Sequence, residues 1–148
     1  MALRGLTERR TTVFWLVVDG QGGGIGRTLA ERLVKAFPEA EVGVVGTNST
    51  ATYQMMKAGP AFGATGENAV VFNAARADVI VGPAGIVMAN AMHGEISPAM
   101  AAAITSSNAK ISLIPMNRCR AYITGTAGIK LADCIADMVE AIRRDIVG

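Results

Sequence analysis

The sequence predicts a three-layer α/β fold, in which a mostly parallel sheet of about five strands is covered by helices on both faces. Two observations predict this fold. Short apolar runs alternate along the chain with amphipathic segments of helical period, which is the order expected of parallel strands joined by helices. The apolar runs are also continuous, as expected for strands that are buried on both faces. The 148 residues suit one domain, which we place at residues 13–148 after a solvated lead-in at residues 1–12.

The first half of the chain predicts two strands, each followed by a helix. In chain order we expect a strand at 13–18, a helix at 25–37, a strand at 42–45, a helix at 51–58 and a loop at 59–66. The helix at 25–37 is the clearest of these, because its apolar residues recur every four positions and Pro38 stops it. The strand at 13–18 runs directly into Asp19 and a cluster of glycines.

The stretch at 67–76 fits two descriptions. Its Val70-Val71-Phe72 core has strand propensity, whereas Thr65 as a cap and Glu67 in the first turn favour a helix. We favour the helix, because the next strand follows at once. The remaining elements expected in chain order are a strand at 78–81, a helix at 86–92, a helix that starts at Ser97-Pro98, a strand at 111–114, a short strand at 121–124 and a helix at 131–146.

The composition excludes several classes of protein. Hydrophobic residues make up 51% of the chain and charged residues 18%, which excludes disorder and argues against a coiled coil. A formal net charge of +2 is too weak to indicate a nucleic-acid partner. No apolar run approaches the roughly 20 residues of a membrane span, so we expect no membrane partner. Cys119 and Cys134 are too few for a disulfide framework, so we expect a cytoplasmic protein with reduced thiols.

A run rich in glycine joins the first expected strand to the first expected helix, and it is the strongest local signal in the chain. Its residues are Gly20, Gln21, Gly22, Gly23, Gly24, Ile25 and Gly26. A loop at this place directs backbone N–H groups and the positive end of the helix dipole towards an anion, and side chains would block that approach. The loop therefore predicts a bound phosphate or pyrophosphate, held by amides that have no partner within the protein. The alternative is that the glycines only let the helix pack closely on the strand.

The glycine spacing allows several cofactors. From Gly20 it reads Gly-x-x-x-Gly-Ile-Gly, which is similar to the cofactor loop of short-chain dehydrogenases, and it fits neither GxGxxG nor the Walker A pattern. Dinucleotide sites usually carry Asp or Glu at the end of the second strand to hold the ribose hydroxyls. Here Thr47 and Asn48 occupy that position, and they can still bond a ribose. We therefore expect NAD, NADP or another nucleotide, with Gly82 and Pro83 of a later strand end joining the site.

Polar side chains beyond the expected strand ends are candidates for contact with a substrate or for support of the site: Glu67, Asn68, Glu95, Asn117 and Arg118. Glu67 can replace the acid that is missing after the second strand. Arg118 can bind a phosphate or carboxylate through two hydrogen bonds. The alternatives for these two are an ordinary carboxylate at a helix start and a surface ion pair.

No catalytic residue is predicted. Tyr53 and Lys57 have the spacing of the short-chain dehydrogenase pair but lie too early in the chain, and His93 is the one histidine, which excludes a site of several histidines. His93 near Glu95 can act as a general acid or base, although a solvated turn is the simpler interpretation. Cys119 beside an arginine can be reactive, with packing as the alternative. Methionines interpreted as packing residues are Met88, Met92, Met100, Met116 and Met138.

Taken together, these segments resemble a bacterial family that is catalogued only as a domain of unknown function. The resemblance extends from about residue 13 to the C-terminus, and it implies a Rossmann-like fold and no particular reaction. It gives added weight to Glu67, Glu95 and the Asn117-Arg118 pair. The segments that carry it are 19–26 (DGQGGGIG), 46–48 (GTN), 63–69 (GATGENA), 81–83 (VGP), 94–96 (GEI) and 115–119 (PMNRC).

Two functions remain open from the sequence. The first is a nucleotide- or dinucleotide-phosphate-binding protein of unassigned reaction; if it is an enzyme, an NAD(P)-dependent oxidoreductase is the first expectation. The second is a non-enzymatic regulatory or assembly module that self-associates and binds an anion or no ligand. The apolar composition and the short helices favour a homo-oligomer, a dimer or larger.

Overall fold

Five parallel strands form the centre of the molecule, as the sequence predicts. The computed structural model describes residues 12–116 and 121–147. The spatial order of the strands is β3-β2-β1-β4-β5, with every neighbouring pair parallel. Their bounds are β1 (Phe14–Asp19), β2 (Glu41–Gly46), β3 (Phe62–Thr65), β4 (Val79–Pro83) and β5 (Lys110–Ile114). The chain winds from β1 out to β3 and then crosses to the other side of β1 for β4, so the switch in winding direction lies between β1 and β4.

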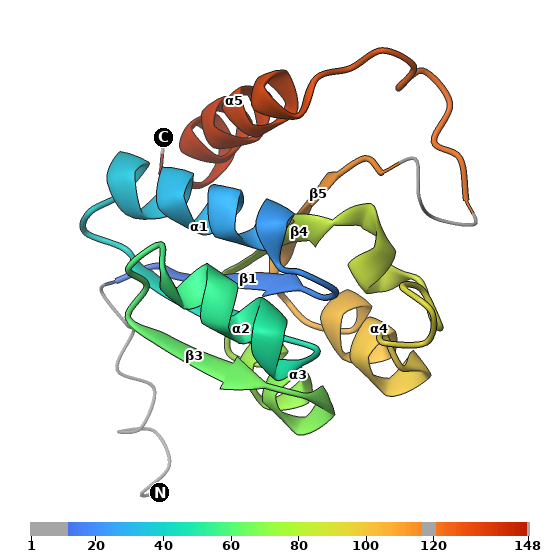
Figure 1. Ribbon diagram of the computed structural model, residues 1–148. Coiled ribbons are helices and arrows are strands. Elements are labelled where there is room, and N and C mark those ends of the chain that lie inside the picture. The colour runs from blue at the N-terminus through green and yellow to red at the C-terminus, as the bar shows by residue number, and fades with distance from the viewer. Residues whose placement is uncertain (1–11, 117–120, 148) are drawn as a thin grey trace, which may run out of the picture.

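Helices cover both faces of this sheet. Their bounds are α1 (Gly24–Ala36), α2 (Ser49–Met56), α3 (Glu67–Ala74), α4 (Pro98–Thr105) and α5 (Leu131–Ile142), with a 3₁₀ turn η2 (Ala84–Val87) and a π-helical end η3 (Arg143–Val147). On one face Trp15 of β1 packs in a core with α1, α2 and α5. On the other face Leu16 of the same strand packs in a second core with α3 and α4. Figure 1 shows these three layers, with α1 and α5 on one side of the sheet and α3 and α4 on the other.

Most of the stretch at 67–76 is helical, as we favoured, since α3 spans Glu67–Ala74. The expected cap is wrong: Gly66 precedes the helix without a side-chain cap, and Thr65 is the last residue of β3. The expected start of α4 is also confirmed. The Ser97 side chain accepts a hydrogen bond from the amide of Met100, and Pro98 occupies the first helical position.

Three expected elements are wrong. Residues 59–66 are not only a loop, because they contain β3, an edge strand that pairs with one neighbour and whose glycine and small residues give little strand signal. Residues 121–124 form no strand: they have strand propensity but no neighbouring strand, and Tyr122 is 64% exposed. Residues 86–92 form no α-helix, because η2 ends at Val87 and the backbone turns left-handed at Asn90 and Met92.

Candidate functional site

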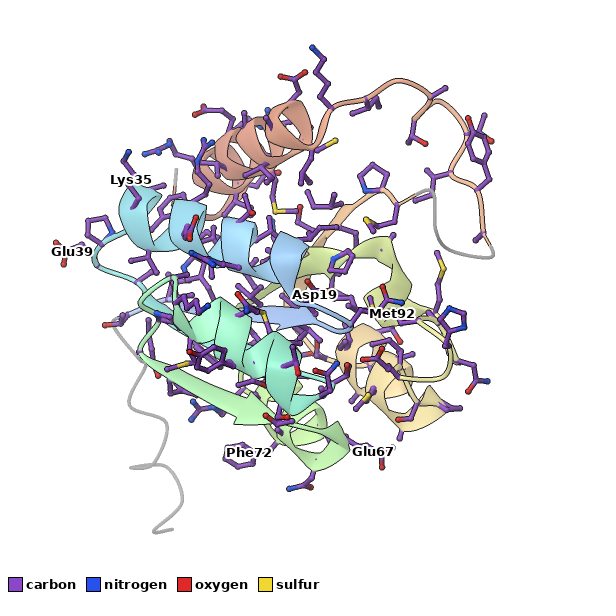
Figure 2. All side chains as sticks on the ribbon, viewed as in Figure 1. Asp19, Lys35, Glu39, Glu67, Phe72 and Met92 are labelled. Atoms are coloured by element: carbon purple, nitrogen blue, oxygen red, sulfur yellow. The ribbon has the colours of Figure 1, made fainter. Side chains whose placement is uncertain are left out.

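Asp19, the last residue of β1, fixes both ends of the glycine loop by accepting hydrogen bonds from its backbone. Its carboxylate is buried; Oδ1 accepts the N–H of Gly20 and Oδ2 the N–H of Gly26, each at 2.7 Å. Gly26 is the third residue of α1, and the residue that precedes this helix, Gly23, has no side chain to cap it. The carboxylate at the strand end therefore serves as the helix cap. Figure 2 shows Asp19 where β1 passes into the loop before α1.

Glu95 also fixes the glycine loop, by accepting a hydrogen bond from the amide of Gln21. It belongs to residues 88–97, which we name the 88–97 connection because they join η2 to α4. One oxygen, Oε1, accepts hydrogen bonds from the Gln21 amide at 2.9 Å, from Thr47 Oγ1 at 2.7 Å and from Asn48 Nδ2 at 2.7 Å. The next residue, Ile96, is fully buried in the second core and fixes the position of Glu95. The carboxylate thus ties together the glycine loop, the end of β2 and the 88–97 connection.

Three amides of the loop remain without a partner. Of the seven residues 20–26, four donate inside the protein, three of them to the two carboxylates and one to a backbone carbonyl. The amides without a hydrogen-bond partner in the described part of the chain are those of Gly22, Gly24 and Ile25. Gly24 and Ile25 begin α1, where the dipole of the helix favours negative charge.

The glycines of the loop serve two purposes. Gly23 has a φ of 70°, and a Cβ there would lie 2.7 Å from the carbonyl oxygen of Ala51. At Gly26 a Cβ would lie 2.7 Å from Cβ of Asp19, so close packing explains both glycines. At Gly22 and Gly24 nothing lies within 4 Å of an added Cβ, and neither residue has a left-handed φ. The fold therefore does not require glycine at these two positions.

A cavity of about 600 Å³ opens on the loop at the carboxyl ends of β1 and β4. Residues 20–25 and residues 90–93 form two adjoining parts of its lining, and Asp19, Pro83, Gly85 and Met116 complete it. Binding sites for small molecules have volumes of roughly 300–1,000 Å³. The cavity also lies at the switch in winding direction, where ligands bind in open parallel sheets.

Backbone strain is concentrated around this cavity. In the described part of the chain, the non-glycine residues with positive φ are Gln21 (49°), Asn90 (66°), Met92 (57°) and His93 (57°). All of them line the cavity. Left-handed backbone costs an L-residue about 1–2 kcal/mol, and such strain is often retained at ligand sites.

The structure brings together only part of the expected cofactor site. Residues 20–25 and Pro83 line the cavity as expected. Gly26 does not line it, because its amide donates to Asp19 and its α carbon packs against that residue. Gly82 does not line it either; its missing side chain is explained by the carbonyl of Val18, which a Cβ would strike. Thr47 and Asn48 lie at the end of β2 but bond to Glu95, so they support the loop rather than line the cavity.

The other expected residues lie elsewhere. Glu67 accepts a hydrogen bond from Ser97 Oγ at 2.5 Å and is not part of the cavity lining, and Figure 2 shows it well apart from Asp19. Asn68 lines a second hollow, between β3 and α3. Asn117, Arg118 and Cys119 lie outside the described residues, as does almost all of the expected lead-in at 1–12.

The sequence reasoning missed the second part of the cavity lining. Asn90 and Ala91 were not expected in the site, and Met92 and Met116, interpreted as packing residues, line the cavity instead. Met100 and Met138 are core residues, as expected. The available signal was Asn90 and Gly94, two residues that tolerate left-handed backbone, within a few positions of each other.

The two carboxylates differ in their electrostatics. Burial raises the pKa of Asp19, and the nearby charge of Glu95 adds to that rise, although the hydrogen bonds from Gly26 and Gly20 oppose it. Burial alone would also raise the pKa of Glu95, but the hydrogen bonds from Thr47, the Gln21 amide and Asn48, together with the charge of His93, lower it overall. Glu95 is therefore an ionised acceptor at neutral pH, and Asp19 is the group more ready to take up a proton.

The lowered pKa of Glu95 predicts a pH-dependent contribution to stability. A carboxyl group whose pKa is depressed by folding stabilises the fold above its ordinary pKa of 4.5, and this contribution is lost as the pH falls through the folded pKa. We expect Glu95→Gln to lower the free energy of unfolding by about 0.5–1 kcal/mol at neutral pH, because solvent screens much of the interaction of this partly exposed carboxylate. The difference from the wild type should shrink below pH 4.5.

Urea unfolding of both proteins at neutral and acidic pH measures this difference. Because the charge of Glu95 contributes to the raised pKa of Asp19, the titration of Asp19 differs between the two proteins and is followed separately by the NMR signal of its carboxyl carbon. A difference that stayed constant across the acidic range would contradict the stabilising role of the ionised Glu95.

Other chemistry has little support in the described residues. No group of three or more His, Cys, Asp or Glu side chains gathers there to hold a metal ion. No helix of the described chain is long and apolar enough to span a membrane. Asp19 and His93 are the titratable side chains of the described cavity lining, and Cys134 lies half-buried in α5 as a free thiol.

The strand order and the helices on both faces define a three-layer α/β protein of the Rossmann-like class. The chain belongs to the family described as Domain of unknown function (DUF3842), whose model matches residues 14–147. This match confirms the family resemblance that the sequence suggested. No curated protein and no solved structure matches the chain.

Proposed function

We propose that this protein binds a phosphate-bearing small molecule of nucleotide size, with a phosphoryl group on the amides of Gly22, Gly24 and Ile25. The observation that carries the proposal is that these three amides have no hydrogen-bond partner among residues 12–116 and 121–147 and belong to a loop that lines the cavity. The amides of a loop before a helix, together with the helix dipole, are a common phosphate site. The glycines at 22 and 24 have no packing role, and a bare backbone there lets a ligand approach closely.

The rest of the lining suits the body of a nucleotide. Pro83, Met92 and Met116 offer apolar surface, while Gln21 and Asn90 offer polar groups beside it. Apolar surface combined with a few well-placed polar groups is typical of sites that bind small organic molecules. His93 adds a group that can donate a hydrogen bond to a phosphate or hydroxyl.

The position of Glu95 favours a mononucleotide over a dinucleotide. In the dinucleotide mode, the end of the second strand holds the ribose of the adenosine half. Here Thr47 and Asn48, which stand at that place, both donate to Glu95 Oε1. A ribose would have to compete with these hydrogen bonds, and the 2′-phosphate of NADP would meet the negative charge of Glu95. Among dinucleotides, NAD is therefore favoured over NADP.

A titration with phosphate-bearing probes tests the proposal. Inorganic pyrophosphate, AMP, ATP, NAD⁺ and NADP⁺ are added to the purified chain, while thermal unfolding and the amide NMR signals are followed. We expect at least one mononucleotide to raise the unfolding temperature and to shift the signals of Gly22, Gly24 and Ile25. If every probe leaves both the unfolding temperature and these amides unchanged in the folded protein, the proposal is wrong.

A negative charge introduced at Gly24 tests whether the loop binds an anion. Gly24→Asp puts a carboxylate at the first position of α1, which helix energetics favour, but it also puts negative charge where the phosphate is proposed to bind. We expect the variant to fold at least as stably as the wild type and to bind the best probe about 100-fold more weakly. Gly24→Asn has the same size without the charge and serves as the control; equal affinity in the Asp and Asn variants would contradict an anion site at this loop.

A further inference from the structure

The β3 strand leaves one edge of the sheet open. It is the last strand in the order β3-β2-β1-β4-β5, so one side of its backbone has no neighbouring strand in the described part of the chain. Proteins usually protect such an edge with lysine, proline or a bulge, and Phe62–Thr65 has neither a charged residue nor a proline. The opposite edge differs, since β5 begins at Lys110, whose Nζ lies 3.5 Å from the carbonyl oxygen of Asp145.

Exposed apolar side chains flank the open edge on both faces of the sheet. On α2, Tyr53 is 65% exposed and Met56 is 40% exposed. On α3, Phe72 is 61% exposed, and it lines the second hollow, of about 460 Å³, together with Phe62. Figure 2 shows Phe72 pointing outward beside this edge. A two-fold axis perpendicular to the sheet, beside the middle of β3 and between the two paired strands, would place each of these flanks against its own copy.

The charges along the edge are complementary under the same symmetry. Lys57, just after α2, and Arg76, which lies over the ring of Phe62, stand near the start of β3. Glu67 follows the end of β3 as the first residue of α3. In an antiparallel pairing the start of one strand meets the end of the other, so Glu67 of each copy would face Lys57 and Arg76 of the partner subunit. Arg76 already pairs with Glu41 at 3.9 Å, so Lys57 provides the main attraction for Glu67 of the partner subunit.

We propose that two copies of this chain associate through β3, which pairs antiparallel with itself and extends the sheet to ten strands. The pairing would satisfy the open backbone groups, bury the flanking aromatic side chains and oppose the two charged ends. This proposal rests on the edge of the sheet and is independent of any ligand in the cavity.

Charge reversal on the exposed side chains tests the pairing. Glu67→Lys and Lys57→Glu each place like charges opposite one another in a symmetric dimer, so each should weaken dimerisation about tenfold or more in sedimentation equilibrium. An equimolar mixture of the two variants restores opposite charges at both ends of the interface. We therefore expect the mixture to form a heterodimer about as tightly as the wild type forms its homodimer.

Glu67 also bonds Ser97, and Ser97→Ala controls for the loss of that contact, because it removes this hydrogen bond and the side-chain cap of α4 but keeps the charge of Glu67. This variant should dimerise like the wild type. Two results would overturn the proposal: a wild-type chain that stays monomeric at high micromolar concentration, or a dimer that both charge reversals leave intact.

Discussion

Replacing Gly23 with alanine is expected to destabilise the fold by about 2–4 kcal/mol. Gly23 has a φ of 70°, which strains any residue with a side chain, and its added Cβ would lie 2.7 Å from a backbone oxygen of α2 that cannot move aside easily. The change should also loosen the start of α1 and with it the loop that lines the cavity.

Gly22→Ala is the matched control for this prediction. It makes the same change one residue earlier, where an added Cβ has open space and φ is not left-handed. We expect it to alter the free energy of unfolding by less than about 0.5 kcal/mol. Urea unfolding followed by the fluorescence of Trp15 measures both variants, since the chain has a single tryptophan. Equal effects of the two substitutions would show that the loop does not have the described backbone.

Trp15→Ala is expected to cost about 3–5 kcal/mol of stability. The indole is 1% exposed on β1 and stacks on the ring of Phe37 with 4.6 Å between ring centroids. Truncation would leave a large void in the core that α1 and α5 cover, and the surrounding strands and helices can close it only in part.

Trp15→Phe should cost much less, about 1–2 kcal/mol, for two reasons. Phenylalanine keeps a ring against Phe37. It also removes the indole Nε1, which is buried without a hydrogen-bond partner in the described structure. Thermal unfolding followed by circular dichroism compares the variants without relying on tryptophan fluorescence. A phenylalanine variant as unstable as the alanine variant would mean that the stacked ring contributes little.

The sequence predicted most of the sheet because strands that are buried on both faces consist almost entirely of apolar residues. The strands β1, β2 and β4 are covered on both faces, and their continuous apolar runs mark them clearly. β3 could not be recognised in this way, because it is a strand of 4 residues interrupted by Gly63, and its extended backbone depends on pairing with β2. The expected strand at 121–124 shows the reverse case, in which strand propensity without a partner gives no strand.

The site was predictable only where its residues are close in sequence. The glycine loop with its preceding aspartate is one continuous segment, so its place before α1 could be inferred. Glu95 was a candidate, but its contact with Gln21 spans 74 positions, and no local pattern indicates that the side chain reaches the end of β2. The wall at residues 90–93 depends on left-handed backbone in a connection whose sequence looks helical.

The separation of the interior into two cores by the sheet has a consequence for how the protein tolerates change. Leu33 lies in one core and Ile104 in the other, with the backbone of the strands between them. Truncating Leu33 and truncating Ile104 should each lower the free energy of unfolding. The two losses should add in the double variant, because the residues lie in separate cores. Each helical layer could then diverge, or be redesigned, without a compensating change in the layer across the strands.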